Sequence, residues 1–127
     1  FSIDLRHSNS ETLNALGDAI PDLCEKHRGP CTVQVKELSN DPSLEFPAVV
    51  RDVIRDVAVE LDIDHMDLPS AAGHDARHLH YVCPTGMIFV PCAGGISHNE
   101  AESCKAEDLF HGARVLAGTI ARLADRA

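Results

Sequence analysis

The chain alternates between stretches in which every second residue is apolar and stretches in which apolar residues recur at helical spacing. Residues 1–7 and 31–36 have the two-residue period of a strand with one face in a core and the other in solvent. The period between them predicts a helix over about residues 10–27, in which Pro21 predicts a kink or a break. Residues 1–38 are therefore expected to form one β-α-β unit.

A polar connector over residues 39–44 separates this unit from a stretch with a different period. Beyond it, apolar residues at i, i+3, i+4 and i+7 predict an amphipathic helix over residues 46–61, with Pro47 in its first turn. Because the pattern changes type at the connector, we place a domain boundary there. Residues 1–42 are expected in one domain and residues 43–127 in the next.

The stretch 69–102 holds most of the polar side chains from which a site can be built. Within it, residues 87–90 are consecutive apolar residues between a glycine and a proline, which is typical of a strand covered on both faces by helices. A short helix is expected to open at residues 74–75, and a longer one to follow residue 103. The predicted fold class is α/β with a helix-flanked sheet, and such folds place their sites in loops at the carboxyl ends of strands.

The composition excludes several classes of partner. The chain has 20 acidic and 11 basic residues and a formal charge of −9, whereas binding to a nucleic-acid backbone requires clustered lysine and arginine. Its apolar stretches are far shorter than the roughly 18 to 20 residues that a membrane span requires. We therefore expect a cytoplasmic protein that binds neither nucleic acid nor membranes. Because the chain begins inside an expected strand and without a methionine, we also expect it to be a piece of something longer.

The five cysteines are odd in number, and no two of them have the CxxC spacing of metal or redox motifs. We interpret them as reduced thiols in the core, since free cysteine is among the most buried residue types. Cys92 with His98 as its base would make a nucleophile, but the sequence offers no third group to orient the base. No catalytic residue is assigned.

His98 is the leading candidate for a metal ligand. It stands in a loop between glycines and acids after an expected buried strand, where Glu100 or Glu102 can orient its imidazole. The alternative is a loop histidine that only caps a helix. His74 and His78 have the four-residue spacing of paired zinc ligands, but the HExxH signature is absent, and a solvated helix surface is the alternative for His78.

Arg6 and Asp4 lie on the polar face of the first expected strand. One interpretation is a solvated ion pair, which stabilises a protein little. The other is a bidentate grip on the carboxylate of a ligand, for which the planar guanidinium is suited. Composition and spacing leave both interpretations open.

Five segments carry a resemblance to a known family, namely FSIDLRH, PSAAGHDA, PTGMIFVP, GGISHNEAE and EDLFHGARVLAGTI. In this order they resemble the dinuclear metal-dependent amidohydrolases that include N-carbamoyl-L-amino-acid hydrolases and allantoate amidohydrolases. The resemblance covers nearly all of the chain. It implies a β-α-β piece over residues 1–42, the second half of a lid and dimerisation domain, and the C-terminal part of a catalytic α/β domain over residues 43–127.

The resemblance also implies roles for single residues. The residues that would face the substrate are Arg6, which would hold its carboxylate, and the turn of Ala71, Ala72 and Gly73. The residues that would serve a metal are His98 as a ligand and, beside it, His74 and Glu102. Ala71 stands where the family has a glycine, which costs energy if this residue needs a positive φ.

The part of the family that carries its HxD metal motif, bridging aspartate, paired glutamates and a further ligand histidine has no counterpart in this chain. For the complete protein the resemblance implies two divalent ions (Zn, Mn, Ni or Co), a small-molecule substrate with a carboxylate, and a homodimer. This chain alone is expected to be inactive and to hold no stoichiometric metal. The alternative is a non-catalytic binding or dimerisation module derived from the same fold.

Overall fold

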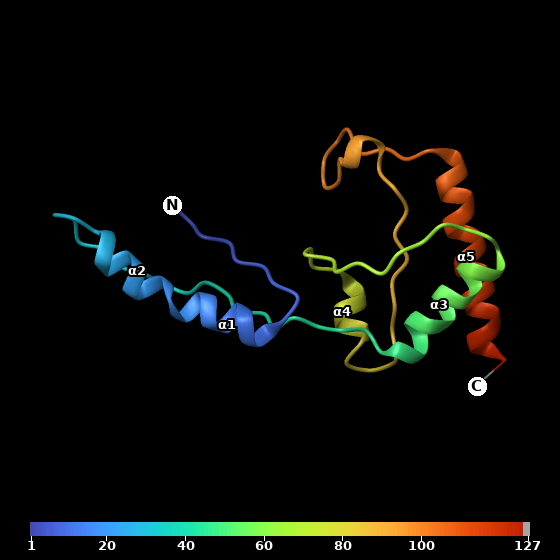
Figure 1. Cartoon of the computed structure of the whole chain (residues 1–127), viewed down its shortest axis with the longest axis horizontal. Coiled ribbons are helices and arrows are strands. Elements are labelled where there is room, and N and C mark those ends of the chain that lie inside the picture. The colour runs from blue at the N-terminus through green and yellow to red at the C-terminus, as the bar shows by residue number, and fades with distance from the viewer. Residues whose placement is uncertain (126–127) are drawn as a thin grey trace. The chain divides into compact units, whose positions relative to one another are not determined.

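The computed structural model describes residues 1–125, which fall into two compact units (Figure 1). The first comprises Phe1–Glu45 and Pro69–Gly73, and the second comprises Phe46–Leu68 and the residues from His74 onward. The predicted boundary after residue 42, and the assignment of the two parts to a lid and a catalytic domain, stay predictions.

The first unit contains two consecutive helices, α1 (Ser10–Asp18) and α2 (Ile20–His27). The Asn9 side chain caps α1, because it accepts a 2.9 Å hydrogen bond from the backbone N–H of Thr12. Pro21 lies in the first turn of α2, the one part of a helix where its missing N–H costs nothing. The break that was predicted near Pro21 is therefore confirmed.

Hydroxyl groups tie the beginning of α1 to the connector that leaves this unit. Ser10 Oγ accepts a 2.9 Å hydrogen bond from the backbone N–H of Ser43, and Ser43 Oγ donates to the carbonyl of His7. No residue of α1 or α2 is buried. The described part of this unit is thus held by hydrogen bonds between distant residues rather than by buried apolar surface.

The helices of the second unit are α3 (Ala48–Glu60), α4 (Asp75–Leu79), the short 3₁₀ helix η1 (Ala93–Gly95) and α5 (Ala106–Ala124). The predictions of an amphipathic helix beyond the connector, a short helix opening at residues 74–75 and a long last helix are confirmed. None of the helices in residues 1–125 has both the length and the apolarity that crossing a bilayer requires.

α3 ends in a Schellman motif, in which one left-handed residue reverses the chain. Asp62 adopts a φ of 55°, and its N–H bonds to the carbonyl of Val59 at 3.0 Å. The N–H of Ile63 reaches back to the carbonyl of Ala58, also at 3.0 Å. Aspartate adopts this conformation more readily than most residues, and the reversal brings the Ile63 side chain onto the core.

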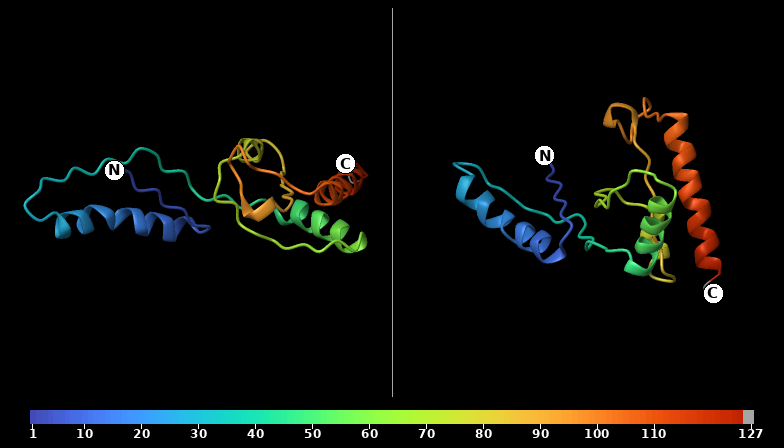
Figure 2. Two further views of the ribbon diagram at one scale, coloured as in Figure 1. Left: turned by 90° about the horizontal axis from the view of Figure 1, so that it is seen from above. Right: turned by 45° about the vertical axis from the view of Figure 1, so that its right-hand side comes forward.

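The core of the second unit lies between α3 and α5, which run side by side in every view (Figures 1 and 2). Its buried residues are Val53, Val57, Ala58 and Val115. Half-buried apolar side chains pack around them, namely Ile54, Leu61, Ile63, Ile88 and Leu123. Ile88 belongs to the apolar run that the sequence predicted as a covered strand, so this run does reach the core.

Two glycines of α5 allow its neighbours to approach closely. A Cβ atom built on Gly118 would lie 2.7 Å from Val57 Cγ1 of α3. One built on Gly112 would lie 2.5 Å from Val90 Cγ1. Side chains do not tolerate carbon contacts this short, so the absence of a Cβ at these positions sets the distance from α5 to α3 and to the apolar run.

No strand is formed within residues 1–125, so the structure does not support the predicted β-α-β unit or the strand over residues 87–90. No backbone hydrogen bond joins residues 1–7 to residues 31–36, and apolar side chains that should cover a core, such as Ile3, are exposed. A strand needs a hydrogen-bonded neighbour, and alternation within one segment does not specify that neighbour. The described residues are helices and extended segments rather than an α/β sheet.

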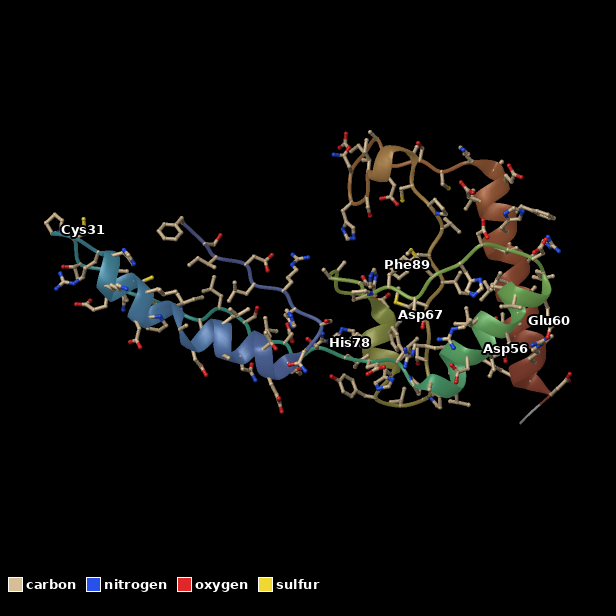
Figure 3. The ribbon with its side chains drawn as sticks, in the orientation of Figure 1. Cys31, Asp56, Glu60, Asp67, His78 and Phe89 are labelled. Atoms are coloured by element: carbon tan, nitrogen blue, oxygen red, sulfur yellow. The ribbon has the colours of Figure 1, made fainter. Side chains whose placement is uncertain are left out.

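The expected burial of the cysteines in the core is also wrong. Cys24, Cys92 and Cys104 are half-buried, whereas Cys31 and Cys83 are exposed. Cys31 lies beyond the end of α2 (Figure 3). The burial habit of free cysteine depends on a core being near, and the first unit has no buried residue in its helices.

The substitution Gly118→Ala should destabilise the second unit. Its new methyl group would collide with Val57, a β-branched side chain in a helix with little rotamer freedom. We expect a net loss of about 1–2 kcal/mol in the free energy of unfolding, because overpacking costs about 1–3 kcal/mol and alanine regains up to about 1 kcal/mol of helix propensity. Urea unfolding followed by circular dichroism measures this loss.

Gly17→Ala in α1 is the matched control, because a Cβ there meets nothing within 4 Å. It should not lower the unfolding midpoint. The double variant Gly118→Ala/Val57→Ala should be less destabilised than the sum of its single changes, since the second change makes room for the new methyl group. Strict additivity would contradict a direct contact between the two positions.

Candidate functional site

The guanidinium of Arg6 joins two of the segments that the sequence assigned to the substrate site. Its Nε and Nη2 atoms donate to Asp4 Oδ2 at 3.1 and 2.6 Å. Its Nη1 atom donates to the carbonyl oxygen of Ala71 at 2.8 Å, across 65 positions of sequence. Both candidates belong to the first unit, and the structure brings them into direct contact.

Neither interpretation of Arg6 is excluded by these bonds. The ion pair with Asp4 is formed, and hydrogen bonding from Arg6 holds the pKa of the Asp4 carboxyl below its usual value. The pair is solvent-exposed, with 56% of the Arg6 side chain accessible. Among the described residues these contacts use three of the five guanidinium N–H groups, so one remains on each terminal nitrogen. A further carboxylate has donors to bind.

The turn over residues 69–73 does not carry the strain that replacement of a glycine would bring. Within residues 1–125 the non-glycine residues with positive φ are Asp62 and His98, so Ala71 has an ordinary backbone conformation. The N–H of Ala72 points to Ser70 Oγ at 3.3 Å. The carbonyl of Ala71 therefore faces Arg6, which positions the guanidinium, and alanine is tolerated in place of glycine.

His98 stands in a loop whose two ends meet. The N–H of Ala93 donates a 2.7 Å hydrogen bond to the carbonyl of Ser103, which closes residues 93–103 into a compact loop. His98 adopts a φ of 55°, a left-handed conformation that histidine adopts more often than most residues. Residues in such conformations occur frequently at functional sites, and the side chain of His98 is exposed.

Glu102 holds the loop in a way that the sequence did not predict. Its Oε2 atom accepts a 2.8 Å hydrogen bond from the backbone N–H of His98, not from the imidazole. The expected contact with the ring is therefore replaced by one that fixes the backbone on which the ring is mounted. Asn99 adds a second hydrogen bond within the loop, because its Oδ1 atom accepts from the backbone N–H of Ala101 at 2.9 Å.

The remaining histidine candidates lie at or before α4. His74 precedes α4, and its ring centroid lies 5.5 Å from that of Phe89. His78 is exposed on α4 (Figure 3). A histidine and an aspartate two residues apart occur at His65 and Asp67, but Asp67 Oδ2 is bonded to Arg55 at 2.6 Å.

Within residues 1–125, no group of three or more His, Cys, Asp or Glu side chains is placed to hold a metal ion. A tight divalent site requires at least three protein ligands. The exposed imidazole of His98 is suited to supply one of them. The described residues can therefore supply part of a metal site, but they do not complete one.

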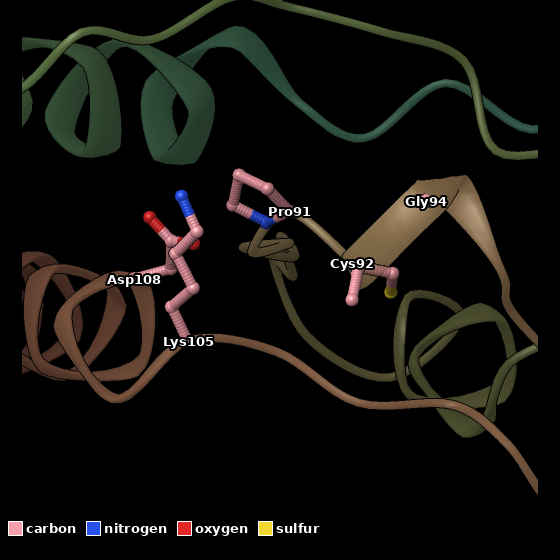
Figure 4. Close-up of a pocket in the computed structure, with 6 residues that line it drawn as sticks. Pro91, Cys92, Gly94, Lys105 and Asp108 are labelled. Atoms are coloured by element: carbon pink, nitrogen blue, oxygen red, sulfur yellow. The ribbon is translucent and has the colours of Figure 1, made fainter.

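Cys92 lies at the base of the same loop, beside a carboxylate. Its Sγ atom is 3.8 Å from Glu102 Oε1, to which the thiol donates. Burial raises the pKa of the Cys92 thiol, and the charge and the hydrogen bond of Glu102 raise it further. A shallow pocket of about 220 Å³ borders this thiol, with Lys105 and Asp108 on its other side (Figure 4).

Several residues that shape the site were missed by sequence reasoning. Asn99 and the pairing of residue 93 with residue 103 depend on how the loop folds, and no spacing rule marks them. The sequence predicted Asp4 only as the ion-pair partner of Arg6. In the structure, its hydrogen bonds also orient the guanidinium toward the Ala71 carbonyl. An acid two residues from an arginine on one strand face was the signal available.

Comparison with known proteins gives consistent results. The sequence profile of peptidase family M20/M25/M40 matches residues 6–122. An N-carbamoyl-L-amino-acid amidohydrolase of Rhizobium meliloti is 35% identical over 120 residues, which are 91% of this chain and 28% of that protein. An allantoate deiminase of Arabidopsis thaliana is 31% identical over 119 residues, which are 86% of this chain and 23% of that protein.

A solved structure is also similar. The crystal structure of an amidase of the hydantoinase/carbamoylase family from Burkholderia multivorans matches with a TM-score of 0.80 and 32% identity, over 89% of this chain and 28% of that one. The fold of this chain is thus that of part of a larger amidase. The chain spans less than a third of the length of each of these relatives.

Substitution of Glu102 by glutamine should lower the pKa of Cys92. The change removes the negative charge and keeps an oxygen that accepts from the His98 N–H, while burial of the thiol is unchanged. Because the thiolate is the reactive form and its intrinsic nucleophilicity falls with its pKa, the rate of alkylation at Cys92 below its pKa should rise by about threefold for each unit by which the pKa falls.

The measurement is the peptide-resolved rate of iodoacetamide alkylation at several pH values. Glu100→Gln removes the same charge from the same loop and is the matched control, which should leave the pKa of Cys92 unchanged. Equal acceleration by both substitutions would contradict a specific interaction of Glu102 with this thiol.

Proposed function

Because this chain belongs to peptidase family M20/M25/M40, we propose that the complete protein is a metal-dependent hydrolase that cleaves a linear amide C–N bond in an N-carbamoyl amino acid or in allantoate. The observation that carries the proposal is the family match over residues 6–122, within which Arg6, Ala71 and His98 all lie. Two relatives, an N-carbamoyl-L-amino-acid amidohydrolase and an allantoate deiminase, suggest the substrate class.

Arg6 is proposed to bind the carboxylate that both substrate types share. Asp4 binds one edge of the guanidinium, and the Ala71 carbonyl binds its Nη1 atom. Because the side chain is already held, less rotamer freedom is lost when a ligand binds. The contacts of the described residues leave two guanidinium N–H groups of Arg6 for the ligand. Asp4 also offsets the charge of Arg6 in the absence of substrate, which keeps the free site near neutrality.

His98 is proposed to supply one metal ligand. A bound divalent ion in hydrolases of this kind polarises the amide carbonyl and activates water. The contribution of this chain is to hold the imidazole on a fixed backbone, through the bond from the His98 N–H to Glu102 and the closure at Ala93. The other ligands and the general base belong to parts of the family that have no counterpart here.

The extended segments are proposed to become strands in the complete protein. In the run 87–90, Ile88 packs against the core and Phe89 is exposed, yet the run has no ladder partner among the described residues. Residues 1–7 have the alternation of a strand and exposed apolar side chains. Neighbouring strands from the rest of the protein would satisfy these backbone groups. A homodimer formed by the lid is part of the same proposal.

In the complete protein, His98→Ala should reduce the bound divalent metal and lower hydrolysis by on the order of 100-fold, because removing even an outer partner of a ligand costs about 10–100-fold. The fold should be retained, since the side chain is exposed. Metal content is measured by elemental analysis, and activity as ammonia released from allantoate and from N-carbamoyl amino acids.

His78→Ala is the control, because this exposed histidine of α4 should change neither quantity. Full activity of His98→Ala would remove the ligand role and leave the hydrolase proposal standing. If the unaltered complete protein hydrolysed neither substrate with any added divalent ion, the proposed activity itself would be wrong. The 127-residue chain alone should retain no stoichiometric metal.

Arg6→Lys in the complete protein should raise KM about tenfold, with a smaller change in kcat. A lysine keeps the charge but cannot hold Asp4, Ala71 and a carboxylate at once, and a charge-assisted hydrogen bond contributes about 1.5–3 kcal/mol. Arg28→Lys is the matched control, since Arg28 is also exposed and paired, with Glu25 at 2.7 Å. An unchanged KM in Arg6→Lys would indicate that Arg6 forms only a surface ion pair and does not bind the substrate.

A further inference from the structure

Two cysteines flank the neck of the loop that carries His98. The hydrogen bond from the Ala93 N–H to the Ser103 carbonyl, 2.7 Å long, joins the two ends of this loop. Cys92 precedes one of these residues and Cys104 follows the other. The N–H belongs to the peptide group that follows Cys92, and the carbonyl belongs to the peptide group that precedes Cys104, so this single bond holds the backbones of the two cysteines close together.

The two cysteines meet the backbone requirement for a disulfide. Disulfides join residues whose Cα atoms lie about 4.4–6.8 Å apart, a separation that two residues flanking one peptide–peptide hydrogen bond can adopt. Both thiols are half-buried. After burial and Glu102, the charge of Cys104 also raises the pKa of Cys92, so Cys104 lies within electrostatic range of this thiol.

The other three cysteines are placed differently. Cys24 and Cys31 belong to the first unit. Cys83 follows α4, where its Sγ is 3.6 Å from the carbonyl of Leu79 and 3.7 Å from Thr85 Oγ1. Among residues 1–125, Cys92 and Cys104 are thus the two cysteines that directly flank one backbone hydrogen bond.

We propose that Cys92 and Cys104 are a redox-sensitive dithiol that closes to an intrachain disulfide across the neck of the loop carrying His98. The oxidant is a low-molecular-weight disulfide such as oxidised glutathione. The Cys104 thiolate attacks one sulfur of this disulfide and releases one small thiol. The Cys92 sulfur then attacks the mixed disulfide, releases the second small thiol and gives its proton to solvent. The two cysteines lose two electrons, and the small disulfide gains them.

The oxidation state of Cys92 and Cys104 affects the loop backbone at His98 through Glu102. In the reduced chain the Cys92 thiol donates to Glu102 Oε1, while Oε2 of the same carboxylate accepts from the His98 N–H. A disulfide sulfur has no proton to donate, so closure of the disulfide removes the first of these bonds. The carboxylate that fixes the His98 backbone is then held from one side only. This inference does not depend on the hydrolase proposal.

The test uses the 127-residue chain with Cys83→Ser, treated with oxidised glutathione and then alkylated. Trypsin and a glutamate-specific protease together separate Cys92, in peptide 78–100, from Cys104, in peptide 103–105. The expected product is these two peptides joined by a disulfide. Its yield should exceed that of the same chain unfolded in urea by on the order of tenfold, because folding holds the thiols together.

The controls separate a specific pair from chance oxidation. Cys92→Ser and Cys104→Ser should each abolish the linked product, whereas Cys31→Ser should leave it unchanged, with circular dichroism confirming that each variant folds. Mixed disulfides with glutathione alone, linkage through Cys24 or Cys31, or an equal yield in the folded and unfolded chain would each overturn the proposal. Because the primary measurement keeps both neck cysteines, it decides the question even if one serine variant does not fold.

Discussion

The second unit depends on the close approach of α5 to α3, which is possible because Gly118 has no side chain where Val57 packs. That approach brings Val57 and Val115 into one buried cluster and places Ile88 against it. The apolar run that contains Ile88 leads directly into the loop of His98, so the same packing supports the base of the candidate site. Small residues at a helix contact have this effect generally, since interior packing leaves no room for an extra methyl group.

Backbone hydrogen bonding is the second constraint, and it explains why the extended segments are not strands. A helix satisfies its N–H and C=O groups within its own sequence, so α3 and α5 form wherever their apolar face finds a cover. An extended segment satisfies them only through a neighbour. Residues 1–7 and 87–90 have the side-chain pattern of strands without that neighbour in residues 1–125. The relatives of this chain are more than three times as long, which is where we place the missing partners.

The two groups of candidate residues are positioned by different means. The guanidinium of Arg6 is oriented by an acid two residues away and by a carbonyl from a distant turn, all of them exposed. The imidazole of His98 is exposed, while its backbone is fixed by Glu102, which also accepts a hydrogen bond from Cys92. Charge and hydrogen bonding orient the first side chain, and loop closure fixes the backbone of the second.

The sequence alone determined the helices, the break near Pro21, the family and the identity of the candidate residues, because each depends on a local period or on a string of side chains. Tertiary structure decided the rest. It joined Arg6 to Ala71, gave His98 its left-handed backbone and turned Glu102 toward that backbone. The strands that the alternating pattern predicted do not form within residues 1–125. These outcomes depend on groups far apart in the chain, and a pattern within one segment holds no information about which distant group its backbone will meet.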